Sequence, residues 1–159
     1  MSKKSQKINK ISAQIDELDR KILRNLRVDS RKSYRTIAQE IGTTTATVIK
    51  RVKELEKKGV IRGYGADIDY EKLGYDITAL VELIISKGKL IEVEREISKI
   101  PNVFGVYDVT GNYDAVILAR FKSRRELDSM LKSLLKLDHV ERTNTHIILN
   151  VIKEGSTLI

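Results

Sequence analysis

In the first third of the chain, apolar residues recur every three or four positions, which is the spacing of amphipathic helices. The run 16–27 is the clearest example, and Asp16 stands where an N-cap is expected. A second run, 34–42, ends at Gly42, and a third begins among threonines and ends near Gly59. We therefore expect three short helices. Their buried positions are Leu18, Ile22, Leu23 and Leu26, then Ile37, Ala38 and Ile41, then Val48, Val52 and Leu55.

The second and third of these helices are separated by a glycine, as in a helix-turn-helix. Gly42 permits the left-handed backbone conformation that a sharp reversal requires. A turn of about 100° per residue from Val48 places lysines opposite the buried stripe of the third helix. The hydroxyl-rich start of this helix suits phosphate, so we expect the helix to enter the major groove of double-stranded DNA. The residues expected to contact DNA are Thr44, Thr45 and Lys50 at bases, Arg51, Lys53 and Lys57 at or near phosphates, and Thr47 on the flank.

From residue 77 onward, strand-like alternation and helical spacing follow one another. Pro101 stops the first helix of this part, and the residues from Ser123 to Glu126 have the pattern of a capping box that begins the second. The turn 110–113 joins the two middle strands. The resulting order, β-α-β-β-α-β, predicts a ferredoxin-like sandwich. Strands are expected at 77–86, 102–109, 114–121 and about 140–152, and helices at 89–100 and 123–137.

Both faces of the expected sheet are apolar. In the run 114–121, Ile117 and Phe121 point one way while Val116 and Leu118 point the other. Two helices cover only one face, so something else must cover the second. Another copy of the chain is the simplest candidate, which predicts a homodimer, and the alternative is that the termini of the same chain cover this face.

These elements predict an α+β fold with two domains. The first is a three-helix, winged helix-turn-helix domain, because the run after Gly59 has the pattern of a strand followed by a linker or turn. The second is the ferredoxin-like βαββαβ sandwich, expected to carry the oligomer contacts. The expected divisions are a basic tail at 1–14, the helix-turn-helix at 15–62, a hinge strand and linker at 63–76, and the sandwich at 77–159.

Charge divides the chain at nearly the same place. Residues 1–62 carry 17 lysines and arginines against 7 aspartates and glutamates, whereas residues 63–159 carry 13 against 15. This asymmetry indicates a basic module that meets a polyanion. Two alternatives remain open: a lysine-rich surface of the kind found in thermostable proteins, and three helices that merely pack together with their lysines solvated.

The composition excludes several kinds of site. The chain has no cysteine, which removes disulfides, thiol catalysis and thiolate metal ligands. Its two histidines, His139 and His146, stand in or beside the last strand, and we expect no catalytic residue, no metal and no cofactor. No apolar run reaches the roughly 18 residues of a membrane span. We expect a soluble cytoplasmic protein that does not bind a membrane.

Four stretches form one combined pattern: DELDRKILRNLR, YRTIAQEIG, TTTATVIKRVKELEKKGVI, and TGNYD in the central hairpin of the sandwich. In this order they resemble the Lrp/AsnC transcriptional regulators, also called feast/famine regulatory proteins. The resemblance covers residues 15 to about 154. It implies a sequence-specific regulator whose dimers often assemble further into octameric discs or hexamers, of which we expect the octamer here. It also implies that the C-terminal domain binds a small molecule such as an amino acid.

The resemblance also implies where an amino-acid effector binds, because the family's G-x-x-D motif falls on residues 111–114. A glycine in this turn permits close backbone approach, exposed amides can bind a carboxylate, and the acid can pair with an ammonium group. Two threonines on the last strand present hydroxyls to one face of the sheet. The alternative is an ordinary glycine-containing hairpin turn. The expected effector-binding residues are Gly111, Asn112, Tyr113, Asp114, Thr143 and Thr145.

Two other functions fit parts of the pattern. Certain siroheme decarboxylases are similar to this family in fold, but a decarboxylase has no need of a basic recognition helix, so we expect no enzyme activity. An architectural, chromatin-like protein would use the same charge and the same oligomer to bind the DNA backbone with little sequence preference. The ratio of specific to non-specific affinity at fixed salt separates that alternative from a regulator.

Overall fold

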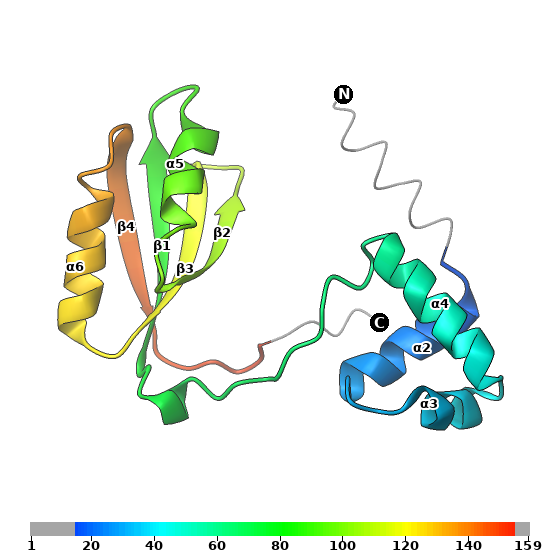
Figure 1. The fold of residues 1–159 in the computed structure, drawn as a ribbon. Helices are drawn as coiled ribbons and strands as arrows, with labels where there is room; N and C mark the ends of the chain where they lie inside the picture. Colours follow the sequence, from blue (N-terminus) through cyan, green and yellow to red (C-terminus); the bar gives the residue numbers. More distant parts are fainter. Residues whose placement is uncertain (1–14, 155–159) are drawn as a thin grey trace. The chain divides into compact units, whose positions relative to one another are not determined.

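The computed structural model describes residues 15–154, which divide into two units, 15–67 and 68–154. Within these residues, the first unit holds three α-helices and the second a four-stranded antiparallel sheet with two α-helices (Figure 1). This is the α+β architecture that the sequence predicts. The basic tail expected at 1–14 lies outside the described residues.

The three helices of the first unit form where the apolar periodicity predicts them. Each begins at a side-chain cap, because Asp16, Ser33 and Thr44 accept a hydrogen bond from the backbone N–H three positions later. The expected buried stripe is confirmed, with Leu18, Leu23 and Ile41 half-buried and the other expected positions buried. The helices are α2 (Glu17–Val28), α3 (Tyr34–Ile41) and α4 (Thr45–Lys57).

The reversal between α3 and α4 depends on Gly42. Its φ of 71° and ψ of 44° lie in the left-handed region, and the N–H of Thr43 bonds to the carbonyl of Ala38 at 2.9 Å to close the end of α3. A Cβ atom at this glycine would meet no other atom within 4 Å. The glycine is therefore needed for its backbone conformation and not for the space it leaves.

The strand expected after Gly59 does not form, and the prediction of a wing was wrong in this respect. Residues 60–70 contain no helix or strand, and the next element is the short 3₁₀ helix η1 (Glu71–Leu73). The physical reason lies at the end of α4, where the N–H groups of Val60 and Ile61 both bond to the carbonyl of Leu55. Those donors complete the helix end, so they are not offered to a neighbouring strand.

The second unit confirms the predicted β-α-β-β-α-β order. Its strands pair in the order β2-β3-β1-β4, all antiparallel. The last strand ends at Ile148, earlier than the expected residue 152. The capping pattern at Ser123 is only half realised: the Ser123 hydroxyl accepts the N–H of Glu126, but the Glu126 carboxylate accepts the backbone N–H of Lys122 and not that of Ser123. The elements are β1 (Ile77–Ile85), α5 (Leu90–Ile97), β2 (Val103–Asp108), β3 (Ala115–Phe121), α6 (Arg124–Leu134) and β4 (Val140–Ile148).

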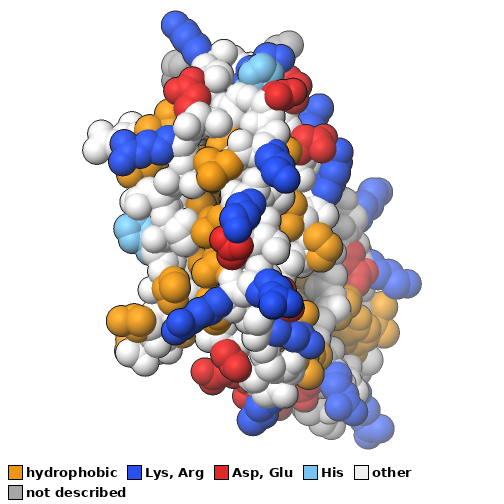
Figure 2. All heavy atoms as spheres, turned by 90° about the vertical axis from the view of Figure 1, so that its left-hand side faces the viewer, with side chains coloured by type: hydrophobic (Ala, Val, Ile, Leu, Met, Phe, Trp, Pro, Cys, Tyr) orange, Lys and Arg blue, Asp and Glu red, His pale blue; other side chains and the backbone are white. Residues whose placement is uncertain are grey.

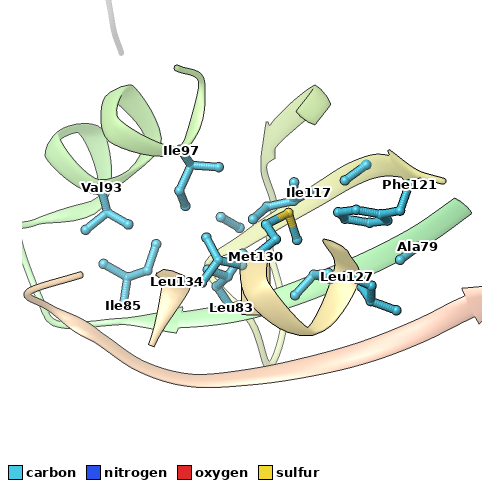
Figure 3. Packing of buried hydrophobic residues seen from close by; sticks show 13 residues of the cluster. Ala79, Leu83, Ile85, Val93, Ile97, Ile117, Phe121, Leu127, Met130 and Leu134 are labelled. Carbon is cyan, nitrogen blue, oxygen red and sulfur yellow. The ribbon is translucent and has the colours of Figure 1, made fainter. Parts of the chain in front are cut away.

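The core of this unit lies between the sheet and its two helices. Val93 and Ile97 of α5, together with Met130 and Leu134 of α6, point toward the strands (Figure 3). Alternate residues of β1 and β3 meet them, and Phe121 is the largest fully buried side chain. Every second residue of β1 and β3 is buried on this face, which is the alternation that the sequence shows in both strands.

The other face of the sheet, here called the outer face, carries the remaining residues of the same strands. Leu80 of β1 stands opposite Leu118 of β3, and both are half-buried. The aromatic rings of Phe104 and Tyr107 on β2 are exposed. Apolar residues on both faces were predicted, and the structure confirms them.

The side of this unit that carries α6 and the edge strand β4 has a mixed surface. Cationic and acidic side chains alternate there with small groups of apolar side chains (Figure 2). Leu135, just after α6, is one of the exposed apolar residues. This side therefore has neither the single charge sign nor the continuous apolar area that marks a docking surface.

Candidate nucleic-acid interface and ligand cavity

The start of α4 is built from threonines. The hydroxyl oxygen of Thr44 accepts the backbone N–H of Thr47 at 3.1 Å and also lies 2.8 Å from the hydroxyl of Thr47. Two of the hydroxyls are therefore engaged in capping the helix, whereas Thr45 is exposed in its first turn. Thr45 is the residue of this group whose hydroxyl is best placed to reach another molecule.

One side of α4 is cationic. Lys50, Lys53 and Lys57 are all exposed, and they lie away from the buried stripe, as the sequence predicts. Within residues 15–154, none of these three lysines takes part in an ion pair. We call Lys50, Lys53 and Lys57 the cationic side of α4.

Arg51 does not belong to this side. Its Nη1 atom lies 2.8 Å from Oδ2 of Asp16 and 3.4 Å from Oδ1 of Asp19, at the start of α2. Asp19 is buried, and together with Asp16 it forms the capping box of α2. The Arg51 guanidinium and a backbone hydrogen bond from Asp19 both hold the pKa of Asp16 below its ordinary value, the hydrogen bond contributing more. Arg51 therefore fastens α4 to α2, and its contact with phosphate stays a prediction.

A cavity of about 350 Å³ opens beside the turn between β2 and β3. It brings together two of the expected effector-binding residues, Asn112 and Tyr113, while Gly111 adopts a φ of 122° in the same turn. Such a conformation is open to glycine and strained for other residues. The residues that line the cavity are Glu82, Val109, Thr110, Asn112, Tyr113 and Val116.

Asp114, the acid of the motif, forms hydrogen bonds with the backbone of β1. Its Oδ2 atom accepts the backbone N–H of Ile85 at 2.8 Å, and its own N–H donates to the carbonyl of Leu83 at 2.9 Å. These two bonds extend the β1–β3 pairing past the last paired residues, Leu83 and Ala115. Asp114 is not among the residues that line the cavity.

Thr143 and Thr145 are also separated from the cavity. They pair with Leu83 and Val81 of β1, whose side chains face the helices. The structure therefore places both threonines on the helix-covered face, whereas Glu82 and Val116 of the cavity belong to the outer face. It does not bring these hydroxyls together with the turn.

Glu82 is the charged residue of the cavity wall, and the sequence analysis did not predict it. Its Oε2 atom accepts a hydrogen bond from Nδ2 of Asn144 at 2.8 Å and lies 3.1 Å from Nε2 of His146. Hydrogen bonds from His146 first, and from Asn144 next, hold the pKa of Glu82 below its ordinary value of 4.5. The sequence feature that could have indicated Glu82 is its position as the single acid in the mainly apolar strand ITALVELII.

A larger cavity of about 490 Å³ lies between the segment that follows residue 67 and the segment that follows β4. Its one cation, Arg120, lies between the rings of Tyr70 and Phe104, with the guanidinium carbon 4.6 and 4.1 Å from the ring centres. The carboxylate of Glu154 accepts bonds of 2.7 Å to both oxygens from this guanidinium. These contacts hold the chain after β4 against the sheet, and the positive charge of Arg120 is balanced by the carboxylate of Glu154.

Comparison with known proteins assigns both units. Residues 15–56 match the model of the AsnC-type helix-turn-helix domain, and residues 78–158 match that of the Lrp/AsnC ligand binding domain. An uncharacterised HTH-type transcriptional regulator of Pyrococcus abyssi is 46% identical over 144 residues, which cover 91% of this chain and 98% of that protein. The chain belongs to the Lrp/AsnC family.

Solved structures of Lrp/AsnC proteins have the same fold. Escherichia coli AsnC superposes with a TM-score of 0.84 at 26% identity, over 89% of this chain and 97% of that one. A feast or famine regulatory protein from Mycobacterium tuberculosis, complexed with L-methionine, superposes with a TM-score of 0.82 at 30% identity, over 88% and 95% of the two chains.

Membership of the Lrp/AsnC family settles the broad function. The relatives are transcriptional regulators and not enzymes, so the protein is a transcriptional regulator of this type with a ligand-binding domain. Along residues 15–154, the structure contains no helix that is both long and apolar enough to span a bilayer.

Proposed function

We propose that the protein is a cytoplasmic, sequence-specific DNA-binding regulator that inserts α4 into the major groove. The cationic side of α4 carries this proposal, because it offers three lysines along a single exposed helix side, and the hydroxyl of Thr45 is exposed at the start of the same helix. A helix of 13 residues held by two others matches the way a helix-turn-helix presents its recognition helix.

Within α4, the residues are proposed to have different roles. Thr45 and Lys50, nearest the helix start, contact base edges, whereas Lys53 and Lys57 contact phosphates farther along. Thr44 and Thr47 hold the helix start in shape, so Thr44 contributes less to base contact than its position in the sequence suggests. Arg51 acts through the packing of α4 on α2.

The active species is proposed to be a homodimer that assembles further, with an octamer as the expected final state. The outer face supports this proposal, since Leu80, Leu118, Phe104 and Tyr107 present apolar area that lies opposite the helix-covered core. A second copy would cover such a face and would also bring two α4 helices to two half-sites of a near-palindrome. Linking two weak modules raises the overall affinity through effective concentration.

The ligand-binding domain is proposed to bind a free amino acid in the cavity beside the turn 110–113. The cavity volume of about 350 Å³ is at the lower end of ligand pockets, which suits a small molecule. The mycobacterial relative complexed with L-methionine supports this class of ligand. Binding there would change the affinity for DNA by favouring one assembly state over another.

The central experiment selects bound duplexes from a random-sequence pool and compares the best site with a scrambled duplex at one fixed salt concentration. A regulator should prefer its site by about 10³-fold or more. A preference of only a few-fold, with a strong salt dependence on every sequence, would show the architectural alternative instead. Sedimentation of the same protein with and without DNA measures the oligomeric state.

A further inference from the structure

The chain that connects the two units is fixed at two tyrosines, and the first of them is Tyr64. Its hydroxyl donates to Oε1 of Glu56 on α4 at 2.8 Å, although about half of the residue is exposed. Burial first, and hydrogen bonds with Glu56 and Tyr34 next, raise the pKa of Tyr64 above its ordinary value. The half-buried Ile61 packs against the core of the same unit. The chain therefore follows the helical unit as far as Tyr64, beyond the end of α4.

The second fixed point is Tyr70, which belongs to the sheet unit. The guanidinium carbon of Arg120 lies 4.6 Å from the centre of its ring, and the ring of Tyr75 meets it edge to face with the centres 5.9 Å apart. The carbonyl of Tyr70 also accepts the N–H groups of Leu73 and Tyr75. Because these contacts lie within one subunit, a second copy over the outer face would exclude water from them and strengthen them.

Between the two tyrosines the chain has little to hold it. Residues 65–68 are exposed and make no hydrogen bond or ion pair within the described part of the chain, and Asp69 bonds forward to Lys72. We call residues 65–69 the joint. Fully extended, it separates the Cα atoms of Tyr64 and Tyr70 by at most about 20 Å.

Loss of both tyrosine contacts would lengthen the free chain in each direction. It would then run from Ile61 to Tyr75, which Lys122 holds independently with Nζ 4.9 Å from the ring centre. The reach of this longer segment is about 45 Å, which is about 25 Å more than that of the joint. The difference is most of the rise of one DNA turn, about 34–36 Å, so it decides which half-sites a helical unit can reach.

We propose that Tyr64 and Tyr70 determine which half-site spacings the protein binds, by limiting the free chain between the units to the joint. The inference rests on the proposed function, since it assumes that two α4 helices of one oligomer contact two half-sites. The tyrosines touch no base and act through the position of α4. Held in place, they favour half-sites at one separation, whereas their release would let the same helices reach neighbouring separations.

Hydrogen exchange on the full chain tests whether Tyr70 ends the joint. The amides of Leu73 and Tyr75 should be protected in the wild type, and Tyr70→Ala should speed their exchange by at least about tenfold. Asp67→Ala is the matched control, because it changes an exposed side chain inside the joint and should leave both amides protected. Equal exchange in the wild type and Tyr70→Ala would overturn the inference.

Binding to duplexes with two copies of the selected half-site tests the consequence for recognition. The spacing is varied one base pair at a time at fixed salt, and the wild type should bind the best spacing at least about tenfold more tightly than one displaced by half a turn. In the Tyr64→Ala/Tyr70→Ala variant the longer free chain should lower affinity at the best spacing about fourfold and reduce the preference to about threefold or less. Asp67→Ala should keep the wild-type preference.

An insertion separates joint length from other effects of the substitutions. Two glycines placed between Ala66 and Asp67 lengthen the joint without changing either tyrosine, and they should flatten the spacing profile in the same way. A profile that the double variant leaves unchanged overturns the inference, whatever the insertion does. Thermal unfolding checks both proteins, and Tyr64→Phe, which loses only the hydroxyl bonded to Glu56, repeats the test if the double variant fails to fold.

The wild-type result separates the inference from the proposed function. Specific binding to the half-site with no preference among spacings overturns the inference alone and leaves the regulator standing. If the wild type binds no sequence specifically, the proposed function fails and the inference fails with it.

Discussion

The guanidinium of Arg51 and the buried carboxylate of Asp19 lie 3.4 Å apart, although 32 positions separate them in the sequence. This contact joins the middle of α4 to the capped start of α2. Removing Arg51 leaves a buried carboxylate without its cation, which is more costly than losing an exposed pair.

The Arg51→Met variant should therefore lower the free energy of unfolding by about 2 kcal/mol. The slope of DNA affinity against salt concentration should stay the same, because no phosphate contact is lost. Urea denaturation and salt-dependent binding measure the two quantities. Lys53→Met is the matched control, with stability close to wild type and a shallower salt slope. A shallower slope for Arg51→Met would show instead that Arg51 reaches the backbone.

Gly42→Ala should destabilise the helical unit by about 1 kcal/mol, because alanine is strained at a φ of 71°. Gly42→Asn should cost less, since asparagine tolerates the left-handed region better. The space around the glycine is open, so crowding cannot account for a loss in either variant. Thermal unfolding measures both, and equal losses for alanine and asparagine would contradict a purely conformational cause.

Asp114→Ala should destabilise the sheet unit by about 1 kcal/mol, because the N–H of Ile85 loses its acceptor. Asp114→Asn keeps an oxygen in the same place, so its stability should stay close to that of the wild type. Hydrogen exchange at the Ile85 amide reports the bond directly. Faster exchange in the alanine variant alone is the expected result, and unchanged exchange in both would remove the structural role of Asp114.

Lys50→Ala should weaken binding to the preferred DNA site by roughly 1–3 kcal/mol if Lys50 contacts a guanine, and should leave non-specific binding nearly unchanged. Lys57→Ala should weaken binding to all sequences alike and reduce the salt slope by about one. Titrations on specific and scrambled duplexes distinguish the two patterns. A uniform loss for Lys50→Ala would place Lys50 at a phosphate.

The stability of the sheet unit should depend on the ionisation of Glu82. Hydrogen bonds from His146 and Asn144 hold its pKa below the ordinary value of 4.5. A depressed carboxyl pKa stabilises the folded state above the unfolded pKa, and this contribution is lost as the pH falls through the folded pKa. The wild type should therefore exceed Glu82→Gln in stability at pH 6, and the difference should shrink below about pH 4.5. Melting curves across this range measure it, and a constant difference would contradict the linkage.

The fold was predictable because its signals are local and periodic. The stripe of Val48, Val52 and Leu55 and the alternation of Ile117 with Val116 each report one element and its buried side. The glycine at 42 and the cap at Asp16 mark element ends that any chain with these residues would share. The prediction of a wing was wrong because a strand forms only where a partner strand accepts and donates its hydrogen bonds. Residues 60 and 61 instead use their N–H donors at the end of α4.

The candidate sites were only partly predictable because they depend on pairings distant in sequence. Arg51 looked like a phosphate contact on its own helix, and the acids that engage it lie on α2. Thr143 and Thr145 present hydroxyls to one face, but the register with β1 decides which face that is. Glu82 gave only the signal of an acid in an apolar strand until the fold placed it beside the turn.

The anchoring of Asp16 by Arg51 also fixes where the chain enters the helical unit, at the flank of α4. An affinity tag fused directly to residue 15, in place of the residues before it, would begin close to Arg51 on the flank of the helix proposed to meet the duplex. An acidic tag in that position would repel phosphate and make the protein look like a weaker binder than it is. Affinity measurements should therefore be made after such additions have been cleaved away.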